Sequence, residues 1–149
     1  MNIAVLFTGG TIGSTLAGDV IGTKTGAADG LLDTLPCVER DGHVEEITYQ
    51  VYHPYTLLSE NSTGLTIAQL AQSIREVVSE VKYTGSAKVA LGNKGEAEDG
   101  TSVFTGLDGL IIMHGTDTLA YSAAAMGYLF GDCDIPMVFV SSNYVLTDP

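Results

Sequence analysis

The sequence predicts an α/β protein built on a doubly wound, mainly parallel β-sheet. Short apolar runs that end in glycine, serine or threonine are typical of strands covered on both faces, and there are three: 2–7, 109–115 and 135–142. Two segments with helical spacing, 66–81 and 117–130, lie between these runs. Strands that alternate with helices predict right-handed crossovers, as in Rossmann-like and flavodoxin-like folds.

Taken in order, the first strand, "NIAVLF", leads directly into "TGGTIGS". A further strand is expected in "EITYQVYHP", which alternates until Pro54 stops it. Two glycine-rich stretches, 14–30 and 82–106, are interpreted as loops or insertions outside the core. For the second, we expect a two-stranded excursion over a cleft or an oligomer surface.

The two helices differ in character. Residues 66–81 place apolar side chains at helical spacing and polar ones on the other face, which predicts an amphipathic helix. Residues 117–130 are alanine-rich, with Asp117 and Thr118 as candidate caps. We expect Tyr121 and Tyr128 of this helix to pack in the core. Without a linker or repeat, residues 1–149 predict one domain or part of one.

Composition excludes several classes of protein. A hydrophobic content of 45% excludes a disordered chain. Six basic and eighteen acidic residues give a net charge of −12, which argues against a nucleic-acid partner and requires dedicated local donors for any carboxylate ligand. Cys37 and Cys133 lack metal-ligand spacing, so we expect no metal site and two buried thiols. No basic leader or membrane-length apolar run is found, which predicts a cytoplasmic protein without membrane contact.

Ligands of doubly wound sheets collect at the carboxyl ends of the strands, so four loops are of interest: "TGGT", "LLSEN", "HGTDT" and "VSSNY". In the first loop, glycines allow close approach and a threonine hydroxyl can be presented beside backbone N–H groups. The loop lacks the lysine of a phosphate-binding loop. In "HGTDT", a hydroxyl and a carboxylate meet a helix N-terminus where a zwitterion could bind, although for either residue alone helix capping is the favoured interpretation. Either loop alone is structural more often than catalytic.

The two loops together are far more specific. "TGGTIG", followed later by "HGTDT" and "LAYSAAAM", resembles the bacterial-type L-asparaginase and glutaminase family of threonine amidohydrolases. "TLLSENST" resembles the loop that binds the substrate carboxylate in that family. The resemblance implies that residues 1–149 form the front portion of the N-terminal domain of an asparaginase-like fold, without its C-terminal domain.

The resemblance also implies roles for individual residues. Thr11 matches the nucleophile that forms an acyl-enzyme, and Thr116 matches the threonine that activates water. Among the substrate-binding positions, Asp117 would hold the α-ammonium group and Ser59 would donate to the α-carboxylate. The remaining matched positions are Gly10 and Gly115, which bring backbone close to the ligand, Ser142 on the substrate side, and Glu60, where the family often has a neutral side chain.

The implied function is hydrolysis of L-asparagine, or of L-glutamine, to the acid and ammonia without metal or organic cofactor, in a homo-oligomer. Residues 14–30 lack the tyrosine of the family, and its lysine falls beyond Pro149, so we expect little activity from these 149 residues alone. Two alternatives stay open. One is a module that binds an amino acid without turnover, and the other is the ammonia-supplying subunit of a tRNA-dependent amidotransferase.

Overall fold

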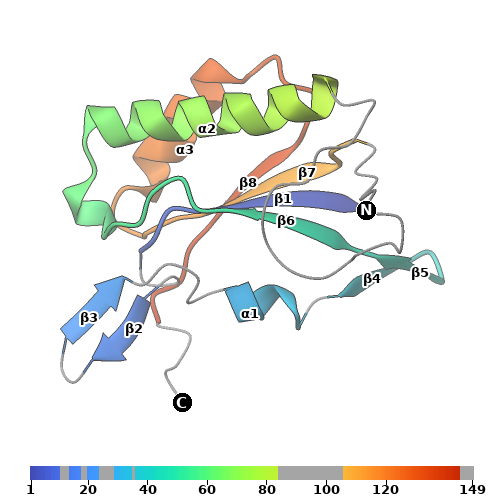
Figure 1. The fold of residues 1–149 in the computed structure, drawn as a ribbon, viewed down its shortest axis with the longest axis horizontal. Helices are drawn as coiled ribbons and strands as arrows, with labels where there is room; N and C mark the ends of the chain where they lie inside the picture. The colour runs from blue at the N-terminus through green and yellow to red at the C-terminus, as the bar shows by residue number, and fades with distance from the viewer. Residues whose placement is uncertain (11–13, 18–19, 24–28, 35, 84–105, 145–149) are drawn as a thin grey trace.

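A four-stranded parallel sheet forms the centre of the protein in the computed structural model. The structure describes residues 1–10, 14–17, 20–23, 29–34, 36–83 and 106–144. The strand order is β6 (Thr48–Tyr52), β1 (Asn2–Phe7), β7 (Gly109–Met113) and β8 (Met137–Val140), and all neighbours are parallel (Figure 1). This arrangement confirms the predicted α/β class with a mainly parallel sheet.

The register of the sheet aligns the strand ends that carry the candidate loops. Val5 of β1 lies opposite Val51 on one side and Ile111 on the other. Met113 at the end of β7 lies opposite Val140 at the end of β8. Because all four strands run in the same direction, the loops that follow them emerge at one edge of the sheet.

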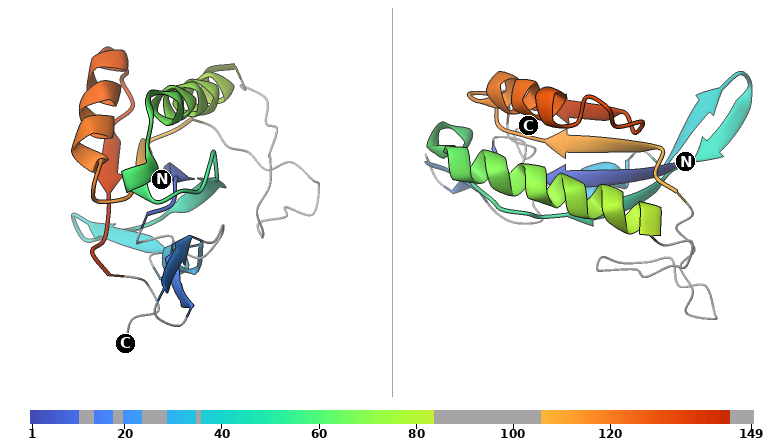
Figure 2. Two further views of the ribbon diagram at one scale, coloured as in Figure 1. Left: turned by 90° about the vertical axis from the view of Figure 1, so that its left-hand side faces the viewer. Right: turned by 90° about the horizontal axis from the view of Figure 1, so that it is seen from above.

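The two faces of the sheet are covered by different elements. Helices α2 (Gly64–Tyr83) and α3 (Leu119–Leu129) lie on one face, and the short helix α1 (Asp29–Leu32) lies on the other (Figures 1 and 2). Coverage of both faces explains why β1 is a continuous apolar run rather than an alternating one.

Helix α2 extends the predicted range, 66–81, by two residues at each end. Its start is fixed by a reciprocal pair of threonines. The Thr63 N–H donates to Thr66 Oγ1 at 2.8 Å, and the Thr66 N–H donates to Thr63 Oγ1 at 3.4 Å. This is the logic of a capping box with threonine in place of glutamate, and it satisfies N–H groups that have no partner within the helix.

Helix α3 begins two residues later than predicted, at Leu119. Thr118 is its N-cap, yet its side chain makes no capping hydrogen bond. The prediction that Tyr121 and Tyr128 pack in the core is wrong, since they are 72% and 92% exposed. The buried face of α3 is formed by Ser122 and Met126, four residues apart, which turns both tyrosines outward.

Two antiparallel ribbons were not predicted. The stretch 14–30, interpreted as a loop, contains β2 (Ser14–Ala17) paired with β3 (Val20–Thr23) and the start of α1. Its glycine content hid this short pairing. The second ribbon joins β4 (Cys37–Arg40) to β5 (His43–Glu46) through Asp41 and Gly42, with φ of 51° and 77°. Positive φ at both central residues is the signature of a tight hairpin turn with an Asp-Gly sequence.

Both strands of the β4–β5 ribbon are exposed along their whole length, and Figure 2 shows the ribbon projecting from the end of the sheet. Cys37 is therefore exposed, which corrects the expectation of a buried thiol, while Cys133 is partly buried. The predicted excursion at 82–106 lies, apart from its first two residues and its last, outside the described residues.

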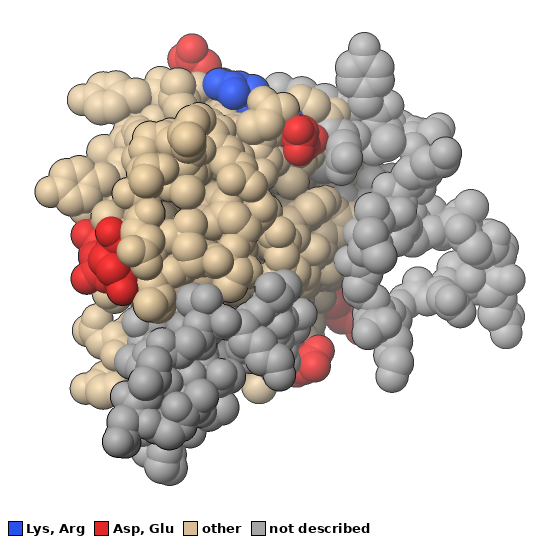
Figure 3. All heavy atoms as spheres, turned by 60° about the vertical axis from the view of Figure 1, so that its left-hand side comes forward, with Lys and Arg blue, Asp and Glu red and all other residues tan. Residues whose placement is uncertain are grey.

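Charged side chains are sparse on the face of the molecule drawn in Figure 3, where isolated acidic groups interrupt a broad uncharged surface. Helix α3 contributes no charge to the surface, because its sequence, "LAYSAAAMGYL", contains no ionisable acid or base apart from two tyrosines. No helix within the described residues has both the length and the apolar character needed to cross a membrane.

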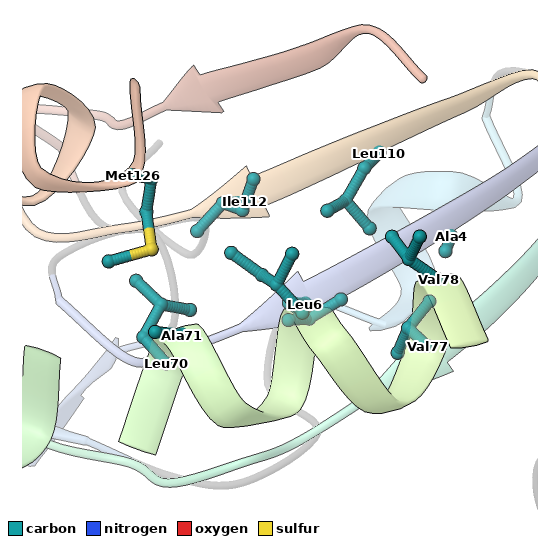
Figure 4. Close-up of a cluster of buried hydrophobic side chains, with 10 residues drawn as sticks. Ala4, Leu6, Leu70, Ala71, Val77, Val78, Leu110, Ile112 and Met126 are labelled. Atoms are coloured by element: carbon teal, nitrogen blue, oxygen red, sulfur yellow. The ribbon is translucent and has the colours of Figure 1, made fainter. Parts of the chain in front are cut away.

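The main core lies between the sheet and the helices α2 and α3. Leu6, Leu70, Ile74 and Ile112 are fully buried there, and Met126 of α3 closes one end of the cluster (Figure 4). A second, smaller cluster on the opposite face includes Val5, Phe7 and Leu32. The fully buried aliphatic side chains of the main core hold the sheet and helices as one unit, which fixes the positions of the strand ends.

Candidate functional site

Three loops meet at the carboxyl ends of β1, β6 and β7, the left edge of the sheet in Figure 1. The Gly10 N–H donates to the carbonyl oxygen of Leu57 at 2.9 Å, and Gly9 forms an isolated parallel bridge with Leu57. The "TGG" loop and the "LLSEN" loop therefore continue the pairing of β1 with β6 beyond the strands.

Glycine is required where these loops touch. A Cβ at Gly10 would stand 2.3 Å from the Cα of Gly115, and Gly10 has a φ of +77°. A Cβ at Gly115 would stand 2.4 Å from both Cβ and Oγ of Ser59. Real side chains do not approach so closely, so the three loops pack through Gly10, Gly115 and Ser59 in series.

Ser59 is the centre of the polar contacts. Its side chain is only 3% exposed, and its Oγ donates to Asp117 Oδ2 at 3.0 Å. The same Oγ accepts the backbone N–H of Asp117 at 3.2 Å. A hydroxyl has one proton, so in this arrangement the proton of Ser59 serves Asp117, and donation to a bound carboxylate requires an exchange of partners.

Thr118 ties the same two loops together a second time. Its hydroxyl lies 3.1 Å from the carbonyl oxygen of Ser59 and 3.2 Å from Ser62 Oγ. The sequence predicted Asp117 and Thr118 as candidate caps of α3. Both side chains instead turn back to the loop that carries Ser59, which leaves Asp117 exposed at the start of the helix.

The other predicted residues occupy different positions around this contact. Thr116 is exposed in the turn between Gly115 and Asp117, and Glu60 is exposed next to Ser59 in the short helix η2 (Ser59–Asn61). Ser142 lies beyond β8, where its Oγ donates to the carbonyl oxygen of Tyr144 at 2.8 Å and accepts the Tyr144 N–H at 3.1 Å. The described bonds of Ser142 are thus local to its own turn. Thr11 lies outside the described residues, directly after Gly10.

The side chain of His114 contacts the backbone of the "HGTDT" loop. The ring is buried, and its Nδ1 lies 2.9 Å from the carbonyl oxygen of Gly115. Because a carbonyl only accepts, Nδ1 carries the proton in this contact. Phe139 of β8 packs against the ring at 6.1 Å between centroids. These contacts favour a role for His114 in orienting the backbone of this loop.

The sequence did not predict the burial of Thr8 and the partial burial of Tyr55, nor the contact between Thr118 and the loop that carries Ser59. Thr8 is the first threonine of "TGGT", and its buried hydroxyl donates to the carbonyl oxygen of Met113 at 3.0 Å. Burial raises the pKa of Tyr55, and a hydrogen bond with the Thr8 hydroxyl partly offsets the rise. The sequence showed only a hydroxyl at the end of a strand. This pattern does not predict which residue the hydroxyl contacts. Among the described residues, no three His, Cys, Asp or Glu side chains gather as a metal site.

Solved L-asparaginases have the same fold as this chain. The thermostable L-asparaginase from Thermococcus kodakarensis aligns with a TM-score of 0.65 and 24% identity, covering 100% of this chain and 36% of that one. L-asparaginase I from Vibrio cholerae gives 0.62 and 23%, covering 99% and 35%. Residues 99–149 match the family described as "Asparaginase, N-terminal". Residues 99–149 thus match the N-terminal asparaginase family, and the chain has the fold of solved L-asparaginases.

The curated relatives of this chain carry two different names. A glutamyl-tRNA(Gln) amidotransferase subunit of Methanosarcina mazei is 31% identical over 148 residues, covering 95% of this chain and 26% of that protein. The corresponding subunit of Haloquadratum walsbyi is 27% identical over 142 residues, covering 95% and 25%. The L-asparaginase of Thermococcus kodakarensis is 41% identical over 46 residues, covering 31% and 14%. The chain spans about a quarter of the length of the amidotransferase relatives.

Proposed function

We propose that this chain supplies the nucleophile side of a threonine amidohydrolase that releases ammonia from the side-chain amide of asparagine or glutamine. Residues 1–149 then correspond to the front portion of the N-terminal domain of an asparaginase-like protein. The observation that carries the proposal is the junction of three loops in which Gly10, Ser59 and Gly115 are in van der Waals contact. This junction brings Gly10 beside the turn that holds Thr116 and Asp117.

The proposed chemistry assigns the two steps of acyl transfer to two hydroxyls. Thr11 attacks the amide carbon, the C–N bond breaks and ammonia leaves, which gives an ester between Thr11 and the substrate. Thr116 then positions a water molecule, which hydrolyses the ester and releases the acid. Threonine is a weak nucleophile at neutral pH, so the reaction also needs a base that accepts the proton of Thr11.

Charge supports Asp117 as the anchor for the substrate's α-ammonium group. Asp117 is exposed at the start of α3, while its Oδ2 is held by Ser59. The net charge of −12 favours an ammonium group over a carboxylate, so the α-carboxylate needs nearby donors. The N-terminus of α3, which begins two residues after Asp117, supplies a favourable local potential for the α-carboxylate.

Ammonia release from L-asparagine and L-glutamine tests the proposal, measured on the protein with everything its gene encodes. We expect Thr11→Ala and Thr116→Ala each to lower kcat by at least about a hundredfold. Thr34→Ala is the matched control, because among the described residues the Thr34 hydroxyl bonds within its own turn, to the carbonyl oxygen of Leu31. Undiminished turnover in Thr11→Ala would refute the assignment of the nucleophile.

Calorimetric titration with L-aspartate separates hydrolysis from binding alone. A catalytic site binds L-aspartate and turns over asparagine, whereas a binding module binds L-aspartate and releases no ammonia. Asp117→Asn keeps the shape of the side chain and removes its charge, so we expect affinity for L-aspartate to fall at least about tenfold. Equal affinity in the Asn variant would exclude Asp117 as the ammonium anchor.

A second candidate function is favoured by the curated relatives. The glutamyl-tRNA(Gln) amidotransferase relative from Methanosarcina mazei matches 95% of this chain, whereas the L-asparaginase relative matches 31%. In this alternative the same site supplies ammonia from glutamine to a partner protein, and the acidic chain itself makes no contact with RNA. Turnover of glutamine that rises when the partner and aminoacylated tRNA are added favours this alternative. Turnover of asparagine by the purified protein alone favours the asparaginase.

A further inference from the structure

The hydroxyl of Thr118 is not used as the hydroxyl of a helix N-cap normally is. Serine or threonine at an N-cap usually accepts a backbone N–H of the first turn, which stabilises the helix. Thr118 is the N-cap of α3 and makes no such bond. Its hydroxyl instead donates to the carbonyl oxygen of Ser59 at 3.1 Å and lies 3.2 Å from Ser62 Oγ. The hydroxyl therefore serves the contact between two loops rather than the helix that follows it.

Asp117 and Thr118 hold Ser59 at two different places. Asp117 bonds the side chain of Ser59, whose Oγ donates to Oδ2 at 3.0 Å and accepts the Asp117 N–H at 3.2 Å. Thr118 bonds the main chain of Ser59 through its carbonyl oxygen. Bonds to the side chain alone leave the backbone behind it free to shift. The bond from Thr118 fixes the backbone from which the Ser59 side chain projects.

The segment that carries Ser59 has little rigidity of its own. Helix η2 is a single 3₁₀ turn, closed by the Ser62 N–H, which donates to the carbonyl oxygen of Ser59 at 3.0 Å. Hydrogen bonds of a 3₁₀ turn have poorer geometry than those of an α-helix. Gly115 packs against Ser59 but has no side chain with which to bond it. An additional bond to Ser59 from outside η2 is therefore needed to hold its backbone in place.

We propose that Thr118 is a positioning residue, whose hydroxyl fixes the backbone of Ser59 and thereby the separation of Ser59 from Asp117. The inference rests on the proposed function for the assignment of these two residues to the charged groups of the substrate, whereas the contact itself does not. An amino acid carries its α-carboxylate and α-ammonium groups on one carbon atom, so the residues that bind them must keep a fixed separation. Loss of the Thr118 hydroxyl should therefore weaken binding more than it slows the reaction step.

The test replaces Thr118 by Val in the full protein, which keeps the branched shape and removes the hydroxyl. We expect the Kd for L-aspartate and the KM for the amide substrate to rise about fivefold, the loss of roughly one hydrogen bond, with kcat within about twofold of wild type. The control is Thr34→Val, which removes a hydroxyl that donates to the carbonyl oxygen of Leu31, outside the three loops of the site. A Kd for Thr118→Val equal to that of the control overturns the proposal.

Two further substitutions of Thr118 separate the hydroxyl from the methyl group. Thr118→Ser keeps the hydroxyl and should bind L-aspartate within about twofold of wild type. Thr118→Ala removes the hydroxyl without adding a methyl group, so it should reproduce the loss caused by Thr118→Val. If the Ser variant bound as weakly as the Val and Ala variants, the hydroxyl would not be responsible and the proposal would be contradicted.

Substitution of Ser62 separates the two contacts of the Thr118 hydroxyl. Ser62→Ala removes the contact at 3.2 Å and leaves the bond from Thr118 to the Ser59 carbonyl oxygen. We expect this variant to bind L-aspartate within about twofold of wild type. A loss as large as that of Thr118→Val would show that Thr118 acts through Ser62, and would overturn the route through Ser59.

A double variant tests whether Thr118 acts by way of Ser59. If Thr118 only positions Ser59, its hydroxyl has little left to position once the Ser59 side chain is truncated. Adding Thr118→Val to Ser59→Ala should therefore raise the Kd by less than about a further twofold. Losses that multiply fully would show that the two residues act independently and would contradict the proposal.

Amide hydrogen exchange separates failure of this inference from failure of the proposed function. The Asp117 N–H is bonded to Ser59 Oγ, so its exchange rate reports separation of the two loops without an enzymatic assay. We expect Thr118→Val to accelerate exchange at Asp117 about fivefold and to leave exchange unchanged at Gly10, whose N–H is bonded to Leu57. Accelerated exchange at Asp117 in a protein without ammonia release would uphold the positioning role and refute the amidohydrolase. Unchanged exchange at Asp117 overturns the positioning role whatever the activity.

Discussion

Ser59 shows how much a single buried hydroxyl can organise. It gives its proton to Asp117, accepts the Asp117 N–H, and offers its carbonyl oxygen to Thr118. Each of these bonds crosses from the loop after β6 to the loop after β7. The carboxylate that we propose as the ammonium anchor is thus aimed by a residue nearly sixty positions away in the sequence.

Replacing Ser59 by Ala should weaken binding of L-aspartate about tenfold, because Asp117 loses a donor worth roughly 1–1.5 kcal/mol. Ser62→Ala is the matched control, since Ser62 Oγ contacts only the hydroxyl of Thr118 in the described network. Titration calorimetry measures both variants. Identical affinities for the two variants would show that the Ser59 hydroxyl does not orient the anchor.

The stability of the protein at alkaline pH tests the burial of individual tyrosine side chains. Burial raises the pKa of Tyr55 and of Tyr49 above the ordinary value of 10.0. A raised pKa means that the unfolded state loses its proton first, so the stabilisation is present below pH 10 and is lost as pH rises through the folded-state pKa. We expect the free energy of unfolding, from urea titrations, to fall above pH 10, and less steeply in Tyr55→Phe. If the free energy of unfolding fell equally steeply with pH in Tyr55→Phe and in the wild type, the raised pKa of Tyr55 would be contradicted.

Among the strands and loops, the site depends on segments that meet without side chains. Gly10 contacts Gly115, and Gly115 contacts Ser59, at distances that leave no space for a Cβ. The strands β1, β6 and β7 bring these loops together because they are parallel neighbours in one sheet. Glycine is needed at these positions because one loop closely approaches another. Helix and strand propensities do not predict this requirement.

Gly115→Ala should therefore lower the free energy of unfolding by about 1–3 kcal/mol, the usual penalty for overpacking. The control is Gly127→Ala in α3, where an added Cβ meets nothing within 4 Å. That change should raise the free energy of unfolding by about 0.5–1 kcal/mol, because alanine favours a helix over glycine. Thermal or urea unfolding measures both, and equal effects would show that the loops can separate at no cost.

Across the molecule as a whole, helix α3 presents an unusual surface. Tyr121, Tyr128 and Leu129 are exposed in a helix that contains no acidic or basic residue, although the chain carries a net charge of −12. A helix that is apolar all round is normally covered, so we expect this face to mediate the predicted self-association.

A negative charge at Tyr128 should break that association, since two copies would bring equal charges together in a dry contact. We expect Tyr128→Glu to shift the protein to a smaller species, measured by light scattering coupled to sizing chromatography. Gln72→Glu adds the same charge on the exposed face of α2, where Gln72 bonds Glu76, and should leave the mass unchanged. A wild-type protein that is already monomeric would contradict the prediction.

Hydrophobic periodicity, together with the residue types at the ends of segments, was sufficient to predict the central sheet and the two long helices. The apolar runs that became β1, β7 and β8, and the helical spacing of α2 and α3, are local patterns whose meaning does not depend on distant residues. The β4–β5 ribbon was missed although its Asp-Gly turn was visible, and the outward direction of Tyr121 and Tyr128 was misjudged because an all-apolar helix carries no signal for its inner face.

Local patterns in the chain were thus enough for the fold class, the family resemblance and three loops that meet at the candidate site. The contacts between those loops came only from the folded chain: the side chains of Asp117 and Thr118 turn to Ser59 instead of bonding the first turn of α3, and Ser142 bonds within its own turn. The two kinds of feature differ in the sequence separation of the residues that determine them. Helix and strand patterns are written in neighbouring residues, whereas the 3.0 Å hydrogen bond from Ser59 to Asp117 depends on the packing of the sheet that brings the two loops together.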